Sequence, residues 1–229
     1  MTAHFTDVGE TAEVVVLPEA AKPTTRKAGL YRNGLKRVFD LLLIVLSAPL
    51  VVPVIAILAV MVAMDGSRPF YRQERVGLGG RKFSILKLRT MVVNADAELE
   101  NHLEQDAAAR AEWVATQKLK NDPRVTKVGR LLRKTSLDEL PQLWNVILGD
   151  MALVGPRPMM TEQQEMYPGT AYYTVRPGIT GAWQISARNS CQFSGRARFD
   201  TKYAANVSFG NDVAILYRTI SIVARGTGY

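Results

Sequence analysis

The stretch LLLIVLSAPLVVPVIAILAVMVAM occupies residues 41–64 and contains no charged side chain. Its 24 residues exceed the roughly 20 that an α-helix needs to cross the hydrocarbon core of a bilayer. Pro49 and Pro53 fall near the middle, where each removes a helix hydrogen bond and bends the chain. The stretch therefore predicts a membrane segment that is broken near its centre, with a straight spanning helix as the alternative.

Positive side chains flank this stretch on both sides. Lys36 and Arg37 precede it, and Arg68, Arg72 and Arg75 follow it. Because positive residues favour the cytoplasmic side of a membrane, both ends are expected to stay on that side. The sequence thus predicts a re-entrant helical hairpin over residues 34–67, in the order helix, break, helix.

An acidic residue, Asp40, lies at the predicted membrane edge, where a carboxylate is costly unless it is paired. Arg37 stands three residues earlier on the same helix face and is the expected partner. We interpret this pair as structural. The residues expected to shape the membrane interface are Lys36, Arg37, Asp40, Pro49 and Pro53.

The composition bounds the rest of the chain. Its 229 residues carry a net charge of +8, which favours anionic partners such as a lipid surface, a phosphorylated substrate or nucleic acid. With one cysteine and two histidines, an internal disulfide is excluded and a zinc site is not expected. Residues 1–33 lack periodic apolar residues and predict a flexible tail, which leaves residues 68–229 as the main domain.

Two strand-like stretches, PFYRQERVG and RKFSILKLRT, surround a glycine cluster at residues 77–80 and predict a β-hairpin. Seven basic residues stand against one acid between residues 68 and 89, as expected of a solvated face or of contact with anionic lipid. Lys87 and Arg89 share one face of the second strand and are candidates for phosphate contact. Residues 94–117 then predict one polar helix.

The segment TSLDELPQLWNVILGDMALVGPRP places Asp138 and Glu139 at the start of an apolar helical pattern. In a purely structural role, Asp138 caps that helix and Glu139 complements its dipole. In a catalytic role, the fixed Asp138 attacks a phosphorus atom, and the two carboxylates hold Mg²⁺ together with substrate phosphates. Arginines suited to phosphate binding lie nearby in the sequence: Arg133, Arg157 and Arg176. The last apolar stretch of the chain predicts either a core helix or an amphipathic helix at the membrane surface, and we favour the helix at the surface.

Several motifs together resemble the monotopic phosphoglycosyl transferases, the bacterial sugar transferases that start exopolysaccharide and O-antigen assembly. The matching motifs are KRVFD, the apolar stretch broken by prolines, FYRQERVG, FSILKLRTM, LRKTSLDELPQLWNVILGDMALVGPRP and VRPGITGAWQISARN. They run from about residue 35 to the C-terminus. Many relatives carry Ser-Pro at the bend of the membrane helix, where this chain has Val52-Pro53 and the additional Pro49.

This resemblance implies an α+β, mostly helical fold with a re-entrant membrane helix, interfacial amphipathic helices and a small β-hairpin. It implies transfer of a sugar 1-phosphate from a UDP-sugar, UDP-galactose or UDP-glucose being favoured, to undecaprenyl phosphate, with release of UMP. Asp138 would be the nucleophile, Glu139 would help to hold Mg²⁺, and Arg157 and Arg176 would contact phosphates. The expected location is the cytoplasmic face of the bacterial inner membrane.

Two other classes of protein would account for part of this sequence. A non-catalytic membrane protein would use its basic face to bind anionic lipid, and Asp138 would then be only a helix cap. A nucleic-acid-binding protein would fit the charge but not the 24 uncharged residues, so nucleic acid is not an expected partner. The sequence leaves open the sugar, the polyprenol length and whether the chain forms a homo-oligomer.

Overall fold

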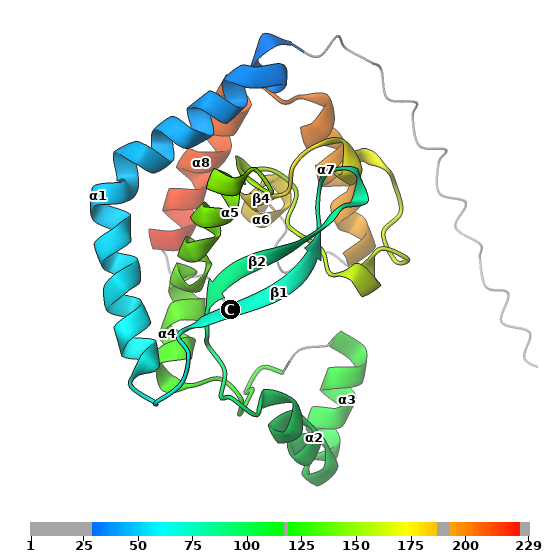
Figure 1. The fold of residues 1–229 in the computed structure, drawn as a ribbon. Coiled ribbons are helices and arrows are strands. Elements are labelled where there is room, and N and C mark those ends of the chain that lie inside the picture. The colour runs from blue at the N-terminus through cyan, green and yellow to red at the C-terminus, as the bar shows by residue number, and fades with distance from the viewer. Residues whose placement is uncertain (1–28, 117–118, 187–192, 225–229) are drawn as a thin grey trace, which may run out of the picture.

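A computed structural model describes residues 29–116, 119–186 and 193–224 of the chain, and most of the predicted tail lies outside this part. The described part is mostly helical with two small sheets, in agreement with the predicted fold class (Figure 1). A long N-terminal helix runs down one side, and a β-hairpin crosses the middle. Two helices, α2 (Ala95–Gln105) and α3 (Ala107–Thr116), stand apart at one end. The helices and strands from residue 127 onward are α4 (Lys127–Thr135), η3 (Leu137–Gln142), α5 (Leu143–Leu148), β3 (Ala152–Val154), η4 (Thr161–Gln163), η5 (Ala171–Thr174), β4 (Gly178–Thr180), α6 (Ala182–Ser186), η6 (Phe193–Gly195), α7 (Arg196–Ala205) and α8 (Phe209–Ala224).

The apolar stretch forms a single bent helix. A turn of π-helix, η1 (Tyr31–Leu35), leads directly into α1 (Lys36–Ala63), and α1 continues through Pro49 and Pro53. The expected break is therefore a bend, which Figure 1 shows as a change of direction near the middle of α1. The combined helix is long and apolar enough to cross a membrane, and only 11% of its most apolar window is buried within the protein.

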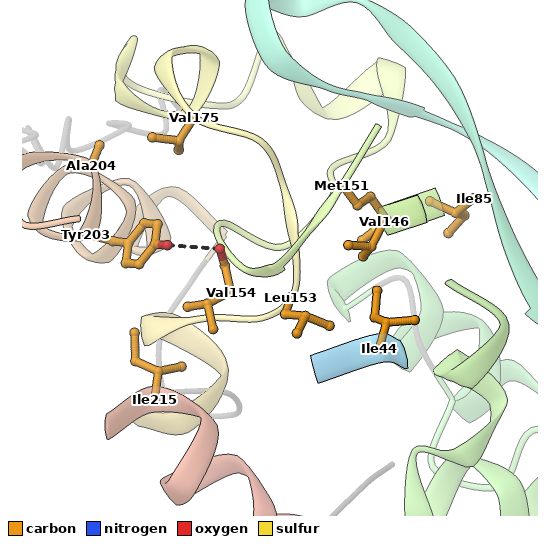
Figure 2. Close-up of a cluster of buried hydrophobic side chains, with 10 residues drawn as sticks. All are labelled: Ile44, Ile85, Val146, Met151, Leu153, Val154, Val175, Tyr203, Ala204 and Ile215. Atoms are coloured by element: carbon orange, nitrogen blue, oxygen red, sulfur yellow. Dashed lines mark hydrogen bonds between the residues drawn. The ribbon is translucent and has the colours of Figure 1, made fainter. Parts of the chain in front are cut away.

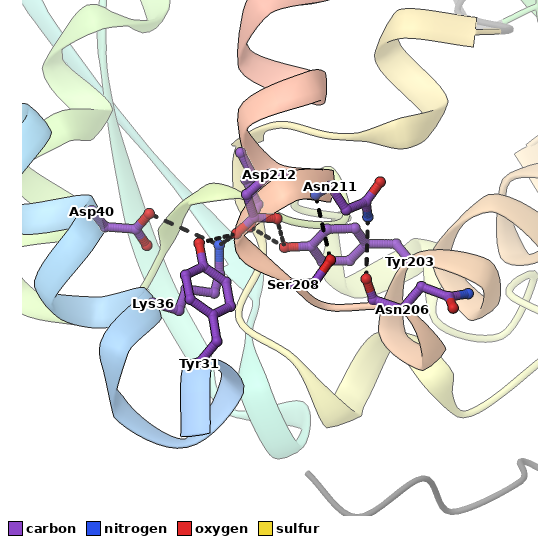
Figure 3. Close-up of polar contacts among 9 residues, drawn as sticks. Tyr31, Lys36, Asp40, Tyr203, Asn206, Ser208, Asn211 and Asp212 are labelled. Atoms are coloured by element: carbon purple, nitrogen blue, oxygen red, sulfur yellow. Dashed lines mark hydrogen bonds and ion pairs between the residues drawn. The ribbon is translucent and has the colours of Figure 1, made fainter. Parts of the chain in front are cut away.

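The beginning of α1 is fixed by a buried polar network (Figure 3). Asp212 of α8 is fully buried, and its Oδ2 accepts hydrogen bonds from the Tyr31 hydroxyl at 2.8 Å and from Lys36 Nζ at 2.6 Å. The other oxygen, Oδ1, lies 2.9 Å from the Tyr203 hydroxyl of α7. One carboxylate therefore joins the first turns of the long apolar helix to α7 and α8.

The ion pair at Asp40 differs from the one that the sequence suggested. Asp40 lies 3.9 Å from Lys36 Nζ, whereas the predicted partner, Arg37, donates to the carbonyl oxygens of Val146 and Ile147. These carbonyls lie at the C-terminal end of α5, where unpaired carbonyls and the helix dipole attract a cation. Arg37 therefore anchors α1, but through α5.

The far end of α1 is attached to the same domain. Arg89 donates to the Val62 carbonyl at 3.2 Å and to Asp65 Oδ1 at 2.6 Å, while Leu58 and Val62 pack in one buried cluster with Leu88. Because α1 rises about 1.5 Å per residue, its 28 residues would span roughly 42 Å if straight. The bend and the two anchors hold both ends against one body.

The predicted β-hairpin is confirmed. The strands β1 (Phe70–Val76) and β2 (Lys82–Leu88) pair antiparallel, from Phe70 opposite Leu88 to Val76 opposite Lys82. The turn η2 (Leu78–Gly80) requires positive φ at Gly79 and Gly80, which glycine adopts without strain.

The single helix predicted for residues 94–117 is wrong, because two helices form within the described part of this segment. The helix α2 (Ala95–Gln105) ends before Asp106, and α3 (Ala107–Thr116) begins after it. The Asp106 carboxylate accepts hydrogen bonds from the backbone N–H groups of Ala108 at 2.8 Å and Ala109 at 2.9 Å. Asp106 thus caps the N-terminus of α3, within a segment whose composition otherwise favours one continuous helix.

A short parallel sheet lies at the centre of the core. Ala152 and Val154 of β3 lie opposite Gly178 and Thr180 of β4. The segment after β3 and the segment before β4 approach each other so closely that a Cβ on Gly155 would come within 2.3 Å of the Arg176 carbonyl. Around this sheet packs the main hydrophobic cluster, in which the Tyr203 hydroxyl donates to the Val154 carbonyl (Figure 2). The members of the cluster are Ile44, Ile85, Val146, Met151, Leu153, Val154, Val175, Tyr203, Ala204 and Ile215.

Replacing Asp212 should destabilise the whole fold. Asp212→Asn leaves the largely buried ammonium of Lys36 without its closest counter-charge, and breaking a buried pair costs up to about 3–5 kcal/mol. We expect a lower thermal midpoint for purified Asp212→Asn in detergent. The exposed Asp96→Asn is the matched control, and equal midpoints for both variants would contradict a structural role of the network.

Candidate active site

A strained turn places the two adjacent carboxylates. The helix α4 ends at Ser136, which has φ 56° and ψ 20° and is the one non-glycine residue with positive φ in the described part of the chain. The chain then enters the short 3₁₀ helix η3, which carries Asp138 and Glu139 in its first turn. Strained backbone of this kind persists where the surroundings fix it, often at functional sites.

Glu139 is held by two cations from distant parts of the chain. Its Oε1 accepts hydrogen bonds from Lys87 Nζ of β2 at 2.8 Å and from Arg157 Nη2 at 2.9 Å. The Glu139 side chain is 13% exposed. Burial alone would raise the pKa of Glu139, but the charges of Arg157 and Lys87 outweigh burial and hold this pKa below its usual range. Glu139 is therefore a fixed anion.

Asp138 differs from its neighbour because no side chain or N–H group of the described residues holds its carboxylate. In the described part of the chain it accepts no hydrogen bond and has no ion pair within 4.0 Å, and η3 has no side-chain cap. The structure therefore gives Asp138 no capping role. Burial raises the pKa of Asp138, while the charge of Lys87 opposes this rise. A carboxylate that is partly desolvated and unpaired is well suited to act as a nucleophile.

A third cation, Arg133 of α4, lies on the Asp138 side of the site. Its Nε donates to Thr90 Oγ1 at 3.0 Å. Burial lowers the pKa of Arg133, and the negative charge of Asp138 counteracts this. Lys87, Arg133 and Arg157, all predicted as phosphate contacts, thus lie around the two carboxylates.

Arg75 is a fourth cation, and sequence reasoning did not single it out for the site. Its Nη1 lies 3.4 Å from the Pro158 carbonyl, and its Nε is buried without a partner among the described residues. Burial and the nearby Arg157 lower the pKa of Arg75 to about 10. Arg75 is one of seven basic residues between residues 68 and 89, and only the folded chain reveals that Arg75, in addition to Lys87, lies within electrostatic range of Glu139.

Among the described residues, four cations around two carboxylates leave an excess of positive charge. We call these four side chains the cationic site; its members are Arg75, Lys87, Arg133 and Arg157. Such a partly buried group attracts a multiply charged anion, because desolvated cations lack enough counter-charge within the protein. Arginines further suit the oxygens of a phosphate, which they bind in a bidentate manner.

Two predicted phosphate contacts lie elsewhere. Arg89 uses its donors to hold the end of α1, so it lies outside the cationic site. Arg176 is exposed, and its Nε donates to the Gly149 carbonyl at 2.8 Å, beside Phe83 of β2. Arg176 lies near Phe83, whereas Glu139 is bound to Lys87. Phe83 and Lys87 are four residues apart on β2, about 13 Å along the strand, so Arg176 lies away from Glu139.

The loop that carries Arg157 is supported from behind by Arg196, a second residue that the sequence did not reveal. Arg196 of α7 is buried, lies against the rings of Trp183, Phe193 and Tyr172, and donates to the Arg157 carbonyl. Its charge is balanced by Asp200 at 3.6 Å. Arginine is rarely buried, and only the packing of the folded chain shows that Arg196 is.

The carboxylates also fit a magnesium ion. Mg²⁺ is usually held by one or two protein carboxylates together with phosphate oxygens. Asp138 has both oxygens available, and the hydrogen bonds of Lys87 and Arg157 both go to Oε1 of Glu139 rather than to Oε2. The described residues contain no cluster of three or more metal-ligating side chains, so this part of the protein does not by itself build a closed metal cage.

The comparison with known proteins agrees with this chemistry. Residues 31–226 match the model of the family described as bacterial sugar transferase. The chain is 50% identical over 196 residues to the "UDP-galactose-lipid carrier transferase" of Erwinia amylovora, an alignment that covers 85% of the chain but 41% of that relative. The chain thus spans about two fifths of the length of this relative.

Two further relatives have lengths closer to that of the chain. The "Exopolysaccharide production protein ExoY" of Rhizobium meliloti is 45% identical over 84% of the chain and 87% of its own length. The "UDP-glucose:undecaprenyl-phosphate glucose-1-phosphate transferase" of Caulobacter vibrioides is 36% identical over 95% of the chain and 78% of its own length.

Neutralising Glu139 should destabilise the protein in a pH-dependent way. Because the pKa of Glu139 is lowered in the fold, its charge adds stability above pH 4.5, its ordinary value, and this stability is lost as the pH falls through the folded pKa. Glu139→Gln is expected to lower the free energy of unfolding by about 1.5–3 kcal/mol at pH 7. The difference from the wild type should narrow below pH 4.5. Thermal unfolding at pH 7 and pH 4, with the exposed Glu104→Gln as control, measures it, and a pH-independent difference would refute the charge pairing.

Proposed function

The chain belongs to the bacterial sugar transferase family, and we propose that it transfers a sugar 1-phosphate from a UDP-sugar to polyprenyl phosphate, with release of UMP. The observation that carries this proposal is the contrast within one pair of carboxylates. Glu139 is held by Lys87 and Arg157, whereas Asp138 lies beside the same cations without a hydrogen bond from the described residues. This arrangement provides a nucleophile next to a binding site for phosphates.

The proposed reaction has two steps. An oxygen of Asp138 attacks the sugar-bearing phosphorus, and the bond to the bridging oxygen breaks, so that UMP leaves with the electron pair. A phosphate oxygen of the polyprenyl phosphate then attacks the same phosphorus. This forms the polyprenyl diphosphate sugar and returns the Asp138 carboxylate. Each step displaces one oxygen by another, so catalysis depends chiefly on positioning and charge neutralisation.

The cations of the site have distinct proposed roles. Arg157 and Lys87 hold Glu139 and remain within reach of a diphosphate, and Arg133 stands near Asp138 to stabilise negative charge. Asp138 and Glu139 would together hold Mg²⁺, with substrate oxygens completing its shell. When bound, the ion supplies positive charge that neutralises the diphosphate.

The sugar is proposed from the relatives. UDP-galactose and UDP-glucose are favoured, because the Erwinia relative is named for galactose and the Caulobacter relative for glucose. Undecaprenyl phosphate is the proposed acceptor, since the Caulobacter relative is named for it. The likeness to ExoY supports a role in exopolysaccharide synthesis.

We further propose that α1 is re-entrant and that the site faces the cytoplasm. Both ends of α1 are anchored to the body that carries the site, through Lys36 and Arg37 at one end and Arg89 at the other. A spanning helix would separate its ends across the bilayer. On this view residues 34–67 are the membrane segment, residues 68–229 form the catalytic domain, and the basic flanks favour the cytoplasmic face.

Replacing the nucleophile tests the reaction. Asp138→Asn should abolish UMP release from UDP-galactose and UDP-glucose by the detergent-purified enzyme with Mg²⁺ and undecaprenyl phosphate, a loss of at least about 10³-fold because a neutral amide cannot form the acyl phosphate. Asp150→Asn is the matched control and should stay active. Turnover by Asp138→Asn close to that of the wild type would show that Asp138 is not the nucleophile.

The membrane arrangement can be tested by labelling from each side. In a background in which Cys191 is replaced by serine, Gly34→Cys is placed at the first residue of the membrane segment and Arg68→Cys just after its last residue. A membrane-impermeant maleimide should label both positions in inside-out vesicles and neither in sealed, right-side-out spheroplasts. Labelling of the two positions from opposite sides would show that the helix spans the membrane.

A further inference from the structure

An apolar cavity of about 240 Å³ opens directly beside the cationic site. Its walls come from η3, α5, β4, α6 and α8, and Glu139 and Arg157 are the charged residues among the described ones that line it. The interior is formed mainly by aliphatic side chains, which include Ile179, Ile185, Leu216 and Val223.

Most polar side chains in the wall of the cavity have hydrogen-bond partners within the protein. The hydroxyl oxygens of Thr180 and Thr219 lie 2.7 Å apart, and Thr219 also donates to the Ile215 carbonyl at 2.8 Å. Gln184 Oε1 is the buried atom of the wall without a hydrogen-bond partner among the described residues, and one water can satisfy it. The cavity is therefore poorly suited to a sugar, whose several hydroxyl groups each need a partner.

The position of the cavity suits an amphiphile with an anionic head. Arg157 lies at its edge within the cationic site, while α8 forms its other wall. The outer face of α8 is apolar, because Val213, Tyr217 and Ile220 are exposed. The start of α8 also contacts the start of α1, where aromatic rings of the two helices lie 5.1 Å apart. The cavity thus lies between the phosphate site and the apolar exterior.

We propose that this cavity receives the isoprene units next to the phosphate of the polyprenyl phosphate acceptor, with Arg157 contacting that phosphate. The proposal rests on the proposed function and adds the place where the acceptor binds. The volume falls below the roughly 300–1,000 Å³ of pockets that enclose drug-sized ligands, so only the first units of a long prenyl chain enter. The remainder follows the exposed apolar faces of α8 and α1 into the membrane.

Filling the cavity tests the proposal. Leu216→Trp reduces the interior, and Val223→Trp narrows the mouth at a half-exposed position where the fold tolerates a larger side chain. Ala205→Trp is the matched control, because it adds the same side chain at an exposed position of α7, outside the cavity and away from the apolar faces of α8 and α1. For each variant, the burst of UMP without acceptor reports the first step, and the KM for undecaprenyl phosphate reports the second.

The expected result is an increase in KM for undecaprenyl phosphate of about tenfold in both cavity variants, the change for losing roughly two buried methylenes. The UMP burst and the KM for the UDP-sugar should match those of Ala205→Trp. A KM for the acceptor equal to that of the control would overturn the proposal. A parallel loss of burst and transfer in both cavity variants would also overturn it, because the cavity would then serve the donor or the fold.

A direct measurement of binding separates this proposal from the proposed function. Farnesyl phosphate that carries a photoreactive diazirine on its first isoprene unit is irradiated with the wild-type protein, and the labelled peptides are mapped. Label on α6 or α8, competed by undecaprenyl phosphate, supports the cavity, whereas label confined to α1 overturns it. If the wild type gives no UMP burst, the proposed function fails, and the labelling still decides whether the cavity binds a prenyl phosphate.

Discussion

The pairing of Glu139 with Lys87 and Arg157 is the contact on which the site depends. Lys87 comes from the β-hairpin, Glu139 from η3, and Arg157 from the loop after β3, so one carboxylate joins three segments that are distant in sequence. Lys87 and Arg157 both contact the same oxygen of Glu139, so these two partly buried cations would repel each other if Glu139 were removed. Because Glu139 is used in this way, the adjacent Asp138 is left as the available carboxylate. A structural and a reactive role are thus divided between two neighbouring residues of the same charge.

The second constraint is the attachment of α1. Most of its apolar surface faces outward, so packing against the protein contributes little to its placement. Polar contacts fix it instead. Asp212 receives Lys36 and Tyr31 at one end, and Arg89 holds Val62 and Asp65 at the other. Hydrogen bonds and ion pairs define direction as well as distance, which burial of aliphatic surface does not. The bend at the prolines then keeps the long helix close to the domain.

These two constraints together explain the arrangement of the site. The cationic site lies at the edge of the core, and the cavity beside it leads toward the apolar faces of α8 and α1. Under the proposed function, the site would serve a water-soluble nucleotide and a lipid-bound phosphate, which differ most in their apolar part and would share only the position for phosphate. Arg196, buried against aromatic rings, fixes the loop that carries Arg157. Such rigidity would suit the proposed transfer between phosphates, which depends on the placement of charge.

The sequence by itself determined what local pattern and composition control. The uncharged stretch at residues 41–64 indicated the long apolar helix, and alternation around glycines indicated the hairpin. The motif around Asp138 and Glu139 indicated the candidate site. It did not determine which cation meets which anion. The tertiary structure paired Asp40 with Lys36, directed Arg37 to the end of α5, placed Arg89 and Arg176 away from the site, and brought Arg75 toward it. The physical reason is that an ion pair forms where folding brings charges together, and 29 basic and 21 acidic residues allow many pairings that no local pattern distinguishes.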